Sequence, residues 1–432
     1  MTTAPTDYRL DGIYRQRQDG CFMQRVKLPA GVISAQQARS VAAVSTRFGQ
    51  GTVHLTTRGS MEIHWLKEED LPQVKRELTK AGLTARGACG GAVRGITCGS
   101  QGAQGFPALE SLARRLQRHF AGNPRYERLP KKFKVGIEAD VVGGRHLIQD
   151  VGLVLAGDEG HARYYDIWIA GGLGREPRPG FLFSERVPEE RIIPIIEAIV
   201  RVYATHAPPP KRLKFLAAEF GEERLRELIE AESVFGEQIP PVGGLPEHLV
   251  PAAEGRQRVE LPVFAGQLTA DQLERIADAA DSCADGVLAV TANQDIALLL
   301  SHGIDAAATL QALRQQLGFE NVVAPTLRVC PGNHECLMGL APTRDVAKSL
   351  VDAVPAGGTG RVWAVSGCPN SCSQPQLADV GVVAARLSAD AEGRKTPRFD
   401  IYRRNGAGLG QKAHEGLTGE ELIAAVQRIA KS

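Results

Sequence analysis

The sequence lacks any apolar run long enough to span a membrane, and it has little excess of charge of either sign. Its 432 residues are 43% hydrophobic and 23% charged, with a formal net charge of +2. Such a chain is globular, can form two or three domains, and gives no global signal for a polyanionic partner. Residues 1–10 contain no apolar segment of the signal-peptide type, so we expect a cytoplasmic protein.

The sequence also has too few cysteines for a disulfide scaffold, with eight in the whole chain. Clustered cysteines in a reducing compartment more often bind metal or do chemistry. We expect the scattered Cys21, Cys89, Cys98 and Cys283 to be buried thiols that behave as small hydrophobic side chains. The remaining cysteines lie in one stretch near the C-terminus and are the candidates for function.

That stretch contains two cysteine pairs. Cys330 and Cys336 are spaced C-x5-C, and Cys368 and Cys372 are spaced C-x3-C within Gly-Cys-Pro-Asn-Ser-Cys. Four thiolates can hold an iron-sulfur cluster or a tetrahedral zinc ion. Zinc sites prefer shorter C-x2-C loops, and a proline after a cysteine is typical of iron-sulfur loops. The pattern therefore favours a redox cluster over a structural zinc.

The chain repeats one plan twice. Val-Lys-Leu-Pro at 26–29 recurs as Val-Glu-Leu-Pro at 259–262. Ile-Ser-Ala-Gln-Gln at 33–37 recurs as Leu-Thr-Ala-Asp-Gln at 268–272, and each copy opens a helix with a hydroxyl N-cap. Between the copies, residues 206–258 are rich in proline and predict a linker with one helix. In a duplicated chain we expect the site at the seam between the copies.

Basic residues provide candidate ligands for an anion. Arg58 ends a strand, Arg94 lies in a glycine-rich loop, and Lys132 and Lys134 alternate on one face of an extended segment. Arginine suits oxyanions, and a desolvated lysine can donate protons. Each residue alone is more often a solvated surface charge. Together, opposite a redox cluster, they suit a small and multiply charged oxyanion.

The two copies differ at these positions. The strand end that carries Arg58 carries Ala292 in the second copy. The second copy holds the cysteines, whereas we expect the corresponding region of the first to be the Leu-Pro-Lys-Lys-Phe-Lys segment at 129–134. One half would then offer cations and the other thiolates.

Taken together, these motifs resemble the assimilatory sulfite and nitrite reductase hemoproteins. The two cysteine pairs, the Thr-Thr-Arg strand end, the loop arginine and the Leu-Pro-x-Lys-Phe-Lys segment carry the resemblance, which runs from about residue 12 to the end of the chain. It implies an α+β fold that is internally duplicated. Two ferredoxin-like half-domains and two α/β siroheme-cluster lobes would be related by pseudo-two-fold symmetry.

The resemblance also implies the domain limits. They are 1–83 for the first half-domain, 84–205 for the first siroheme-binding lobe with the anion-binding cations, 206–258 for the linker, 259–325 for the second half-domain and 326–432 for the second lobe with the cysteines.

By the same resemblance, the cofactors would be a siroheme and a [4Fe-4S] cluster. The implied cluster ligands are Cys330, Cys336, Cys368 and Cys372. Cys372 would also bridge to the siroheme iron, and Asn370 would contact the siroheme. The residues implied around the bound anion are Arg58, Arg94, Lys132 and Lys134. Candidates for the siroheme carboxylates are Arg25, Arg175, Arg178, Lys211, Arg212 and Lys214.

The sequence departs from the family pattern in three places. Gly59 stands where relatives often have glutamine, and Gly95 stands where asparagine is usual. Cys98 lies close to where some relatives have a cysteine linked to a tyrosine, and Tyr14 is the only nearby candidate for such a link. The cross-link stays open.

The implied activity is a six-electron reduction of sulfite to sulfide. The family tends to have lysine at the position of Lys134 in sulfite enzymes and asparagine in nitrite enzymes, and a fuller set of cations suits the more highly charged sulfite. Reduction of nitrite to ammonia is the alternative. A monooxygenase similar to precorrin-3B synthase is less favoured, because Lys134 and the segment at 62–65 look more like the reductases. A cluster protein without heme would not need the four cations.

The sequence contains no flavin or nicotinamide fingerprint. A separate electron donor is therefore expected, either a small acidic ferredoxin or a flavoprotein subunit. We expect no nucleic acid and no membrane among the partners.

Overall fold

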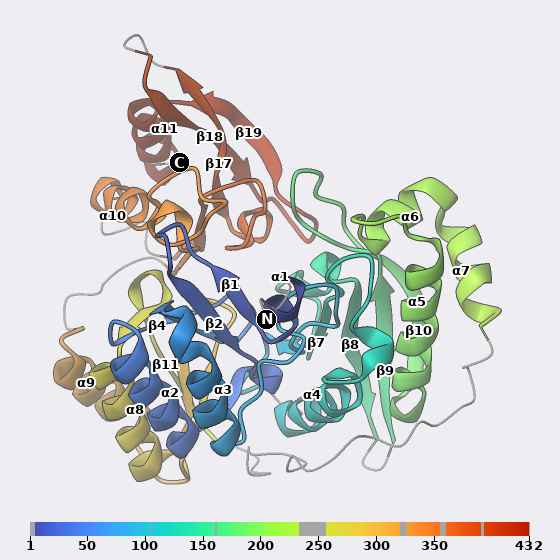
Figure 1. Cartoon of the computed structure of the whole chain (residues 1–432), viewed down its shortest axis with the longest axis horizontal. Helices are drawn as coiled ribbons and strands as arrows, with labels where there is room; N and C mark the ends of the chain where they lie inside the picture. The colour runs from blue at the N-terminus through green and yellow to red at the C-terminus, as the bar shows by residue number, and fades with distance from the viewer. Residues whose placement is uncertain are drawn as a thin grey trace.

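A computed structural model shows four β-sheets within the described residues, each covered by helices (Figure 1). The described residues are 5–103, 105–159, 162–232, 256–319, 326–354, 360–389 and 393–431. Two sheets belong to small half-domains and two belong to larger lobes. In Figure 1 the second lobe, in orange and red, lies above the half-domains, and the first lobe, in cyan and green, lies beside them.

The first half-domain is a five-stranded antiparallel sheet covered by two helices. Its strands, in spatial order, are β1 (Ile13–Arg15), β2 (Phe22–Val26), β5 (Met61–Leu66), β4 (Thr52–Leu55) and β12 (Gln267–Thr269). The covering helices are α2 (Ala35–Phe48) and α3 (Leu71–Lys80), and the short α1 (Pro5–Leu10) precedes the sheet. In α2, Ala38, Val41, Ala42 and Ser45 are buried at helical spacing, which produces one face that packs on the sheet.

The second half-domain repeats this arrangement with a four-stranded antiparallel sheet. Its strands are β11 (Arg258–Leu261), β14 (Ile296–Leu299), β13 (Val287–Val290) and β3 (Val32–Ser34), and its helices are α8 (Ala270–Cys283) and α9 (Ala306–Leu317). The helices α2 and α8 pack against each other, so the two half-domains share one hydrophobic core.

Each half-domain contributes one short strand to the sheet of the other. β3 comes from the first copy and pairs with β13, and β12 comes from the second copy and pairs with β4. Ser34 and Thr269 end these strands and form capping boxes with Gln37 and Gln272 at the starts of α2 and α8. The hydroxyl N-caps predicted from the repeat are confirmed. The exchange joins the two copies through backbone hydrogen bonds.

The first lobe contains a mixed five-stranded sheet. Its strands, in spatial order, are β10 (Phe181–Pro188), β9 (Arg163–Ile169), β8 (Val151–Asp158), β7 (Val135–Glu138) and β6 (Thr97–Cys98). β6, β7 and β8 are parallel, and β7 is buried along its whole length, as expected for a parallel strand with covered faces. The lobe's helices are α4 (Phe106–Phe120), α5 (Ile192–His206), α6 (Leu213–Phe220) and α7 (Glu222–Glu230).

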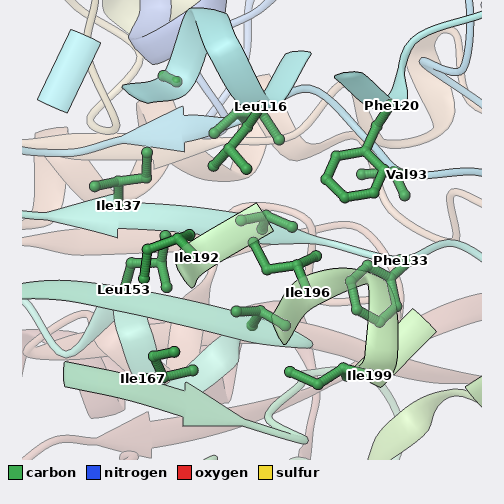
Figure 2. Close-up of a cluster of buried hydrophobic side chains, with 14 of the residues drawn as sticks. Val93, Leu116, Phe120, Phe133, Ile137, Leu153, Ile167, Ile192, Ile196 and Ile199 are labelled. Carbon is green, nitrogen blue, oxygen red and sulfur yellow. The ribbon is translucent and has the colours of Figure 1, made fainter. Parts of the chain in front are cut away.

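Figure 2 shows the core of this lobe. Leu116 and Phe120 of α4 and Ile192, Ile196 and Ile199 of α5 pack with side chains of the sheet. The labelled sheet and loop residues in the same core are Val93, Phe133, Ile137, Leu153 and Ile167. Val93 and Phe133 are direct neighbours of the candidate site residues Arg94, Lys132 and Lys134. The hydrophobic core therefore holds the backbone from which those cations project.

The second lobe has the same topology as the first. Its strands are β15 (Leu327–Val329), β16 (Trp363–Ser366), β17 (Val380–Ala389), β18 (Lys395–Arg403) and β19 (Gln411–Leu417), and its helices are α10 (Thr343–Ala353) and α11 (Gly419–Lys431). β15, β16 and β17 are parallel and the others are antiparallel, which matches β6 to β10 strand by strand. The predicted α+β architecture with internal duplication is confirmed.

Equivalent hydrogen bonds align the two lobes and correct one expectation. The backbone N–H of Lys134 donates to Asp150 at 2.8 Å, and that of Val362 donates to Asp379 at 2.7 Å. Lys134 is therefore equivalent to Val362, which lies between the two cysteine pairs. Residues 129–134 thus lie in the region that corresponds to the cysteine stretch, but they match the segment between the pairs and not the cysteines themselves. The cysteines follow the carboxyl ends of β15 and β16, whereas Lys134 precedes the amino end of β7.

A second correction concerns Arg58. The Thr56 hydroxyl accepts from the N–H of Arg58 at 3.3 Å, and the Thr291 hydroxyl accepts from the N–H of Asn293 at 3.2 Å. The residue equivalent to Arg58 is thus Asn293, one position beyond the expected Ala292. The second copy still has no cation at this turn.

The sequence predicted one helix in the linker. The described part of this segment, residues 206–232 and 256–258, contains two helices, α6 and α7. Leu213, Leu216, Leu225 and Ile229 of these helices are buried in the core of the first lobe. The proline-rich part at 233–255 lies outside the described residues. The domain limits inferred from the sequence stay a prediction.

The core in Figure 2 leads to a stability prediction. Replacing the fully buried Ile196 by alanine removes packed methyl groups and leaves a cavity, so the free energy of unfolding should fall by about 2–5 kcal/mol. Guanidinium denaturation followed by circular dichroism measures the loss. Val142→Ala is the control, because Val142 is 79% exposed and its truncation should change the free energy by less than about 0.5 kcal/mol. Equal effects of the two substitutions would contradict the described core.

Candidate active site

The first cysteine pair lies on a tight loop that begins where β15 ends. The Cys330 thiol accepts a hydrogen bond from the N–H of Gly367 at 3.1 Å, and the Cys330 carbonyl accepts from the Thr343 hydroxyl at 2.5 Å. The short helix η8 (Gly332–His334) follows, and the chain then turns back on itself. A side chain at Gly339 would meet the backbone of Gly332 at 2.2 Å, so only glycine permits this close approach.

The second pair follows β16, beside the first pair. Burial raises the pKa of the Cys330 and Cys336 thiols, and it raises that of Cys368 to about 11. The sulfur of Cys372 adds to each of these shifts, so the four sulfurs interact electrostatically around one place. Among the described residues, no group of three or more His, Cys, Asp and Glu side chains is arranged to hold a single metal ion. Four grouped thiols are the donor set that a [4Fe-4S] cluster needs.

The loop of Cys372 is bound directly to the turn that carries Arg58. The Thr57 hydroxyl donates to the carbonyl of Cys372 at 2.8 Å, and the Gln374 side-chain amide donates to the carbonyl of Thr57 at 3.1 Å. Ser371, with φ 56°, and Gln374, with φ 58°, adopt left-handed conformations in this loop. Cys372 and Asn370 are both exposed. The site thus lies at the seam between the copies, as expected from the duplication.

The structure brings the four predicted cations to this seam. The Arg58 guanidinium donates to the Gln149 side chain and to the carbonyl of Gly95, both at 2.9 Å. Arg94 is buried and donates to the carbonyl of Gly90 at 3.0 Å, while its Nη1 has no hydrogen-bond partner among the described residues. Lys132 and Lys134 both interact electrostatically with Cys372. Cations and thiols that are far apart in the sequence therefore share one site.

Burial and mutual repulsion shift the pKa of the lysines downward. Burial lowers the pKa of Lys132 to about 8, and Arg212 and Arg94 contribute to the shift. Burial also lowers the pKa of Lys134 well below its ordinary value, with further contributions from Arg58, Arg212 and Lys132. Cys372 opposes both shifts. A bound anion would relieve this repulsion and raise both pKa values.

Lys27 belongs to the same cation group and was not identified from the sequence. It is buried, and its ammonium donates to the carbonyl of Arg86 at 3.0 Å. Burial lowers its pKa to about 7, and the charges of Arg94 and Arg58 contribute. The sequence does carry a signal, because Lys27 is replaced by Glu260 in the repeated Val-x-Leu-Pro segment.

Arg25 also lies in this group, although the sequence suggested it only as a siroheme candidate. It forms an ion pair with the buried Glu62 and interacts electrostatically with Arg94 and Arg58. Although burial opposes ionisation of Glu62, the Arg25 guanidinium holds the pKa of that carboxyl well below its usual range. Glu62 also influences Cys336, which places this ion pair between the cations and the cysteines.

The other siroheme candidates fall into two groups. Arg212 and Lys214 are buried and bind protein groups: Arg212 forms an ion pair with Asp150 at 2.7 Å, and Lys214 donates to the carbonyl of Leu173 at 3.1 Å. The exposed candidates are Arg175, Arg178 and Lys211. Arg212 also interacts with Arg58 and Lys134, so it extends the cation group toward the first lobe.

Cys98 and Tyr14 have different neighbours in the structure. Cys98 is buried in β6, where burial and the nearby Glu138 raise the pKa of its thiol. Tyr14 instead interacts with the Cys89 thiol and with the Arg94 guanidinium. The link of Cys98 to Tyr14 that the sequence left open has no geometric support.

No helix in the described part of the chain is both long enough and apolar enough to cross a bilayer.

Two family models match the first lobe and both half-domains. A family model described as the nitrite and sulphite reductase 4Fe-4S domain matches residues 100–237. A second, described as the nitrite/sulfite reductase ferredoxin-like half domain, matches residues 14–81 and 252–316. The two segments of the second match coincide with the two half-domains that exchange β3 and β12.

Curated relatives span nearly the whole chain. The ferredoxin sulfite reductase 1 of Mycolicibacterium paratuberculosis is 26% identical, over 98% of this chain and 84% of its own length. The ferredoxin–nitrite reductase of Synechococcus elongatus is 29% identical, over 98% of this chain and 88% of its own length. The solved structure of the NirA protein of Mycobacterium tuberculosis has the same fold, with a TM-score of 0.84 at 24% identity, covering 100% of this chain and 88% of that one.

The lowered pKa of Lys132 predicts how anion binding depends on pH. Lys132 loses its proton as the pH rises through about 8, so the site loses one positive charge above that pH. The affinity for sulfite should then fall by about tenfold, the value of one charge-assisted hydrogen bond. Titration of the cofactor-loaded chain with sulfite, without reductant, from neutral to alkaline pH measures this fall. In Lys132→Arg the charge persists, so the fall should move to higher pH; an unchanged profile would show that Lys132 is not responsible.

Proposed function

Because the chain belongs to the nitrite and sulfite reductase family, we propose that it reduces sulfite to sulfide at the seam between its two copies. It is an oxidoreductase, and the cofactors of this family are a siroheme and a [4Fe-4S] cluster. The relatives include both sulfite and nitrite reductases, so the choice of sulfite is the finer part of the proposal.

The residues at the seam suit these cofactors. Cys330, Cys336, Cys368 and Cys372 would hold the cluster, and Cys372 would also bridge to the siroheme iron. Asn370, exposed beside Cys372, would contact the siroheme. When bound, the coupled cofactors supply the electrons and the iron on which the substrate is reduced. The buried cations around Arg58 and Arg212 would offset the carboxylates of the siroheme.

The observation that carries the proposal is the approach of Lys132 and Lys134 to Cys372. These two cations and Arg58 and Arg94 act on one another or on shared neighbours, and together they would bind the anionic substrate. They would neutralise its charge in a site of low dielectric constant. An electron carrier that lacks a heme has no need for such a set of grouped cations.

The chemistry also requires protons. Sulfite, six electrons and seven protons give hydrosulfide and three water molecules. Lys132, with a pKa lowered to about 8, can release a proton to a leaving oxygen near neutral pH and be reprotonated from solvent. Lys134 has its pKa lowered in the same direction and can act similarly. Arg58 and Arg94 stay charged and hold the anion in place.

The number of cations supports sulfite over nitrite. Sulfite exists partly as the dianion near neutral pH, whereas nitrite carries a single charge, so each cation of the group favours the sulfite dianion more strongly. Lys134 is the lysine that sulfite enzymes tend to have at this position. Nitrite reduction on the same cofactors is the alternative. The comparisons lend no support to a precorrin-3B synthase activity.

Electrons would come from a separate protein. The relatives named above carry ferredoxin in their names. We infer that a small acidic ferredoxin, rather than a flavoprotein, is the donor for this chain. The cytoplasmic location expected from the sequence stays a prediction.

The absorption spectrum of the purified chain tests the cofactor sites. Siroheme bands together with cluster absorbance are expected, because the seam supplies both four thiols and a buried cation group. Cys330→Ser should lose the cluster absorbance, because three thiols cannot complete the ligand set. A Cys330→Ser chain that keeps its full cluster would contradict the ligand assignment.

Lys134 tests the activity itself. Lys134→Ala removes a cation that stabilises charge on the substrate, so turnover of sulfite should fall about a hundredfold while the siroheme spectrum stays intact. Lys134→Asn should raise the ratio of nitrite to sulfite turnover. Lys348→Ala, at an exposed lysine on α10, is the control and should leave both rates unchanged. Loss of the siroheme from Lys134→Ala would instead assign this lysine to cofactor binding.

A further inference from the structure

Two buried glutamines lie at the seam, one for each copy of the fold. Gln294 is 1% exposed and lies in the turn between β13 and β14, with a left-handed φ of 69°. Its side-chain amide donates to the carbonyl of Leu55 at 2.7 Å and to that of Val329 at 3.0 Å. Its side-chain oxygen accepts from the N–H of Val329 at 2.6 Å. One side chain thus binds both backbone groups of Val329.

Gln101 makes the corresponding bonds in the first copy. It is 3% exposed, and its amide donates to the carbonyls of Cys98 at 2.8 Å, Val290 at 3.3 Å and Ala30 at 2.9 Å. Cys98 ends β6 as Val329 ends β15, and Val290 ends β13 as Leu55 ends β4. The two glutamine amides therefore bind equivalent pairs of carbonyl groups across the pseudo-two-fold axis.

The two glutamines are nevertheless not equivalent in the sequence. The alignment of Thr56 with Thr291 makes Gly59 the equivalent of Gln294. Gly59 has the same left-handed conformation, with φ 60°, and a side chain there would start 3.2 Å from the carbonyl of Val290. The first copy thus has a glycine where the second has its glutamine, and Gln101, from the loop after β6, brings an amide to the same place.

The backbone segments that the two glutamine amides bind differ in function. Val329 directly precedes Cys330, and Leu55 belongs to the strand that leads to Thr57 and Arg58. In the first copy Cys98 precedes Gly99, which has no side chain to bind anything. The side-chain oxygen of Gln101 also has no hydrogen-bond partner among the described residues, whereas that of Gln294 holds the N–H of Val329.

We propose that Gln294 is a positioning residue that fixes Cys330 relative to the Arg58 turn before the cluster binds. Gln101 is its counterpart in the first copy, which has no cluster ligand at the equivalent position. The proposal rests on the proposed function, because it takes Cys330 as a cluster ligand. The Gln294 amide reaches across the seam, so it holds the cysteine strand of the second lobe and the cation turn of the first half-domain in one geometry.

Gln101 provides a matched control for Gln294. Gln294→Met and Gln101→Met each replace a buried amide by an apolar side chain of similar size. Each substitution should lower the thermal midpoint of the cofactor-free chain. In the cofactor-loaded chain, release of iron to a chelator should be about tenfold faster or more in Gln294→Met, as for partners that orient metal ligands. In Gln101→Met the release should stay close to that of the unmodified chain. Equal release rates in the two variants, or no increase in Gln294→Met, would overturn the proposal.

Hydrogen exchange tests the same proposal in the unmodified chain. Without cofactors, the peptide 326–331 should be as protected as with them, because Gln294 already holds Val329. Exchange as fast as in an exposed loop in the cofactor-free chain would overturn the proposal, and this result does not depend on how Gln294→Met folds.

Exchange of the glutamine between its two positions tests the equivalence itself. Gln101→Ala should lower the thermal midpoint, and the added Gly59→Gln should restore it, because the new amide reaches the same carbonyl groups. A double variant no more stable than Gln101→Ala would remove the basis of the proposal. Failure of the cluster assignment is recognised separately: Cys330→Ser would then keep its full iron and sulfide content.

Discussion

The mutual repulsion of buried and half-buried cations is the constraint on which this structure depends. Arg58, Arg94, Lys132, Lys134 and Lys27 all act on one another or on shared neighbours, and burial lowers the pKa of each of these lysines. Only a few carboxylates, such as Glu62 and Asp150, lie among them. Such a group is held together by the cores behind it, where Val93 and Phe133 are packed beside Arg94, Lys132 and Lys134. Lys132 and Lys134 of this group interact electrostatically with Cys372 of the second lobe.

Duplication explains how the cations and the thiols are far apart in the sequence and yet close together in the structure. The lobes have the same topology. The lysines of the first lobe precede the amino end of β7, whereas the cysteines of the second lobe follow the carboxyl ends of β15 and β16. The exchange of β3 and β12 and the bonds of Thr57 with the Cys372 loop bring these ends together. Each copy has therefore diverged at different positions, and neither copy alone contains a complete site.

Much of the site could be predicted because its residues carry strong local signals. The cysteine spacing, the Thr-Thr-Arg strand end and the alternating lysines identified the main groups. Gln294 was missed because a single glutamine in a turn looks like any other surface residue, and Lys27 was missed although the repeated segment has Glu260 in its place. The equivalence of Arg58 with Ala292 was wrong by one position, and residues 129–134 match the segment between the cysteine pairs, because an alignment of short similar segments does not determine the register of strands. Hydrogen bonds of Thr291, Asp150 and Asp379 determine it.

The sequence by itself showed the duplication and the grouped cysteines, because both depend on residue types at local spacing, and its resemblance to a known family implied the α+β class and the cofactors. Only the tertiary structure decided which residues meet. It gave Cys98 and Tyr14 different neighbours, brought Lys27 and Arg25 to the cations, and placed Gln101 where Gly59 has no side chain. The physical reason is that these contacts join segments far apart in the chain. Their geometry follows from packing between the two copies, which no single segment encodes.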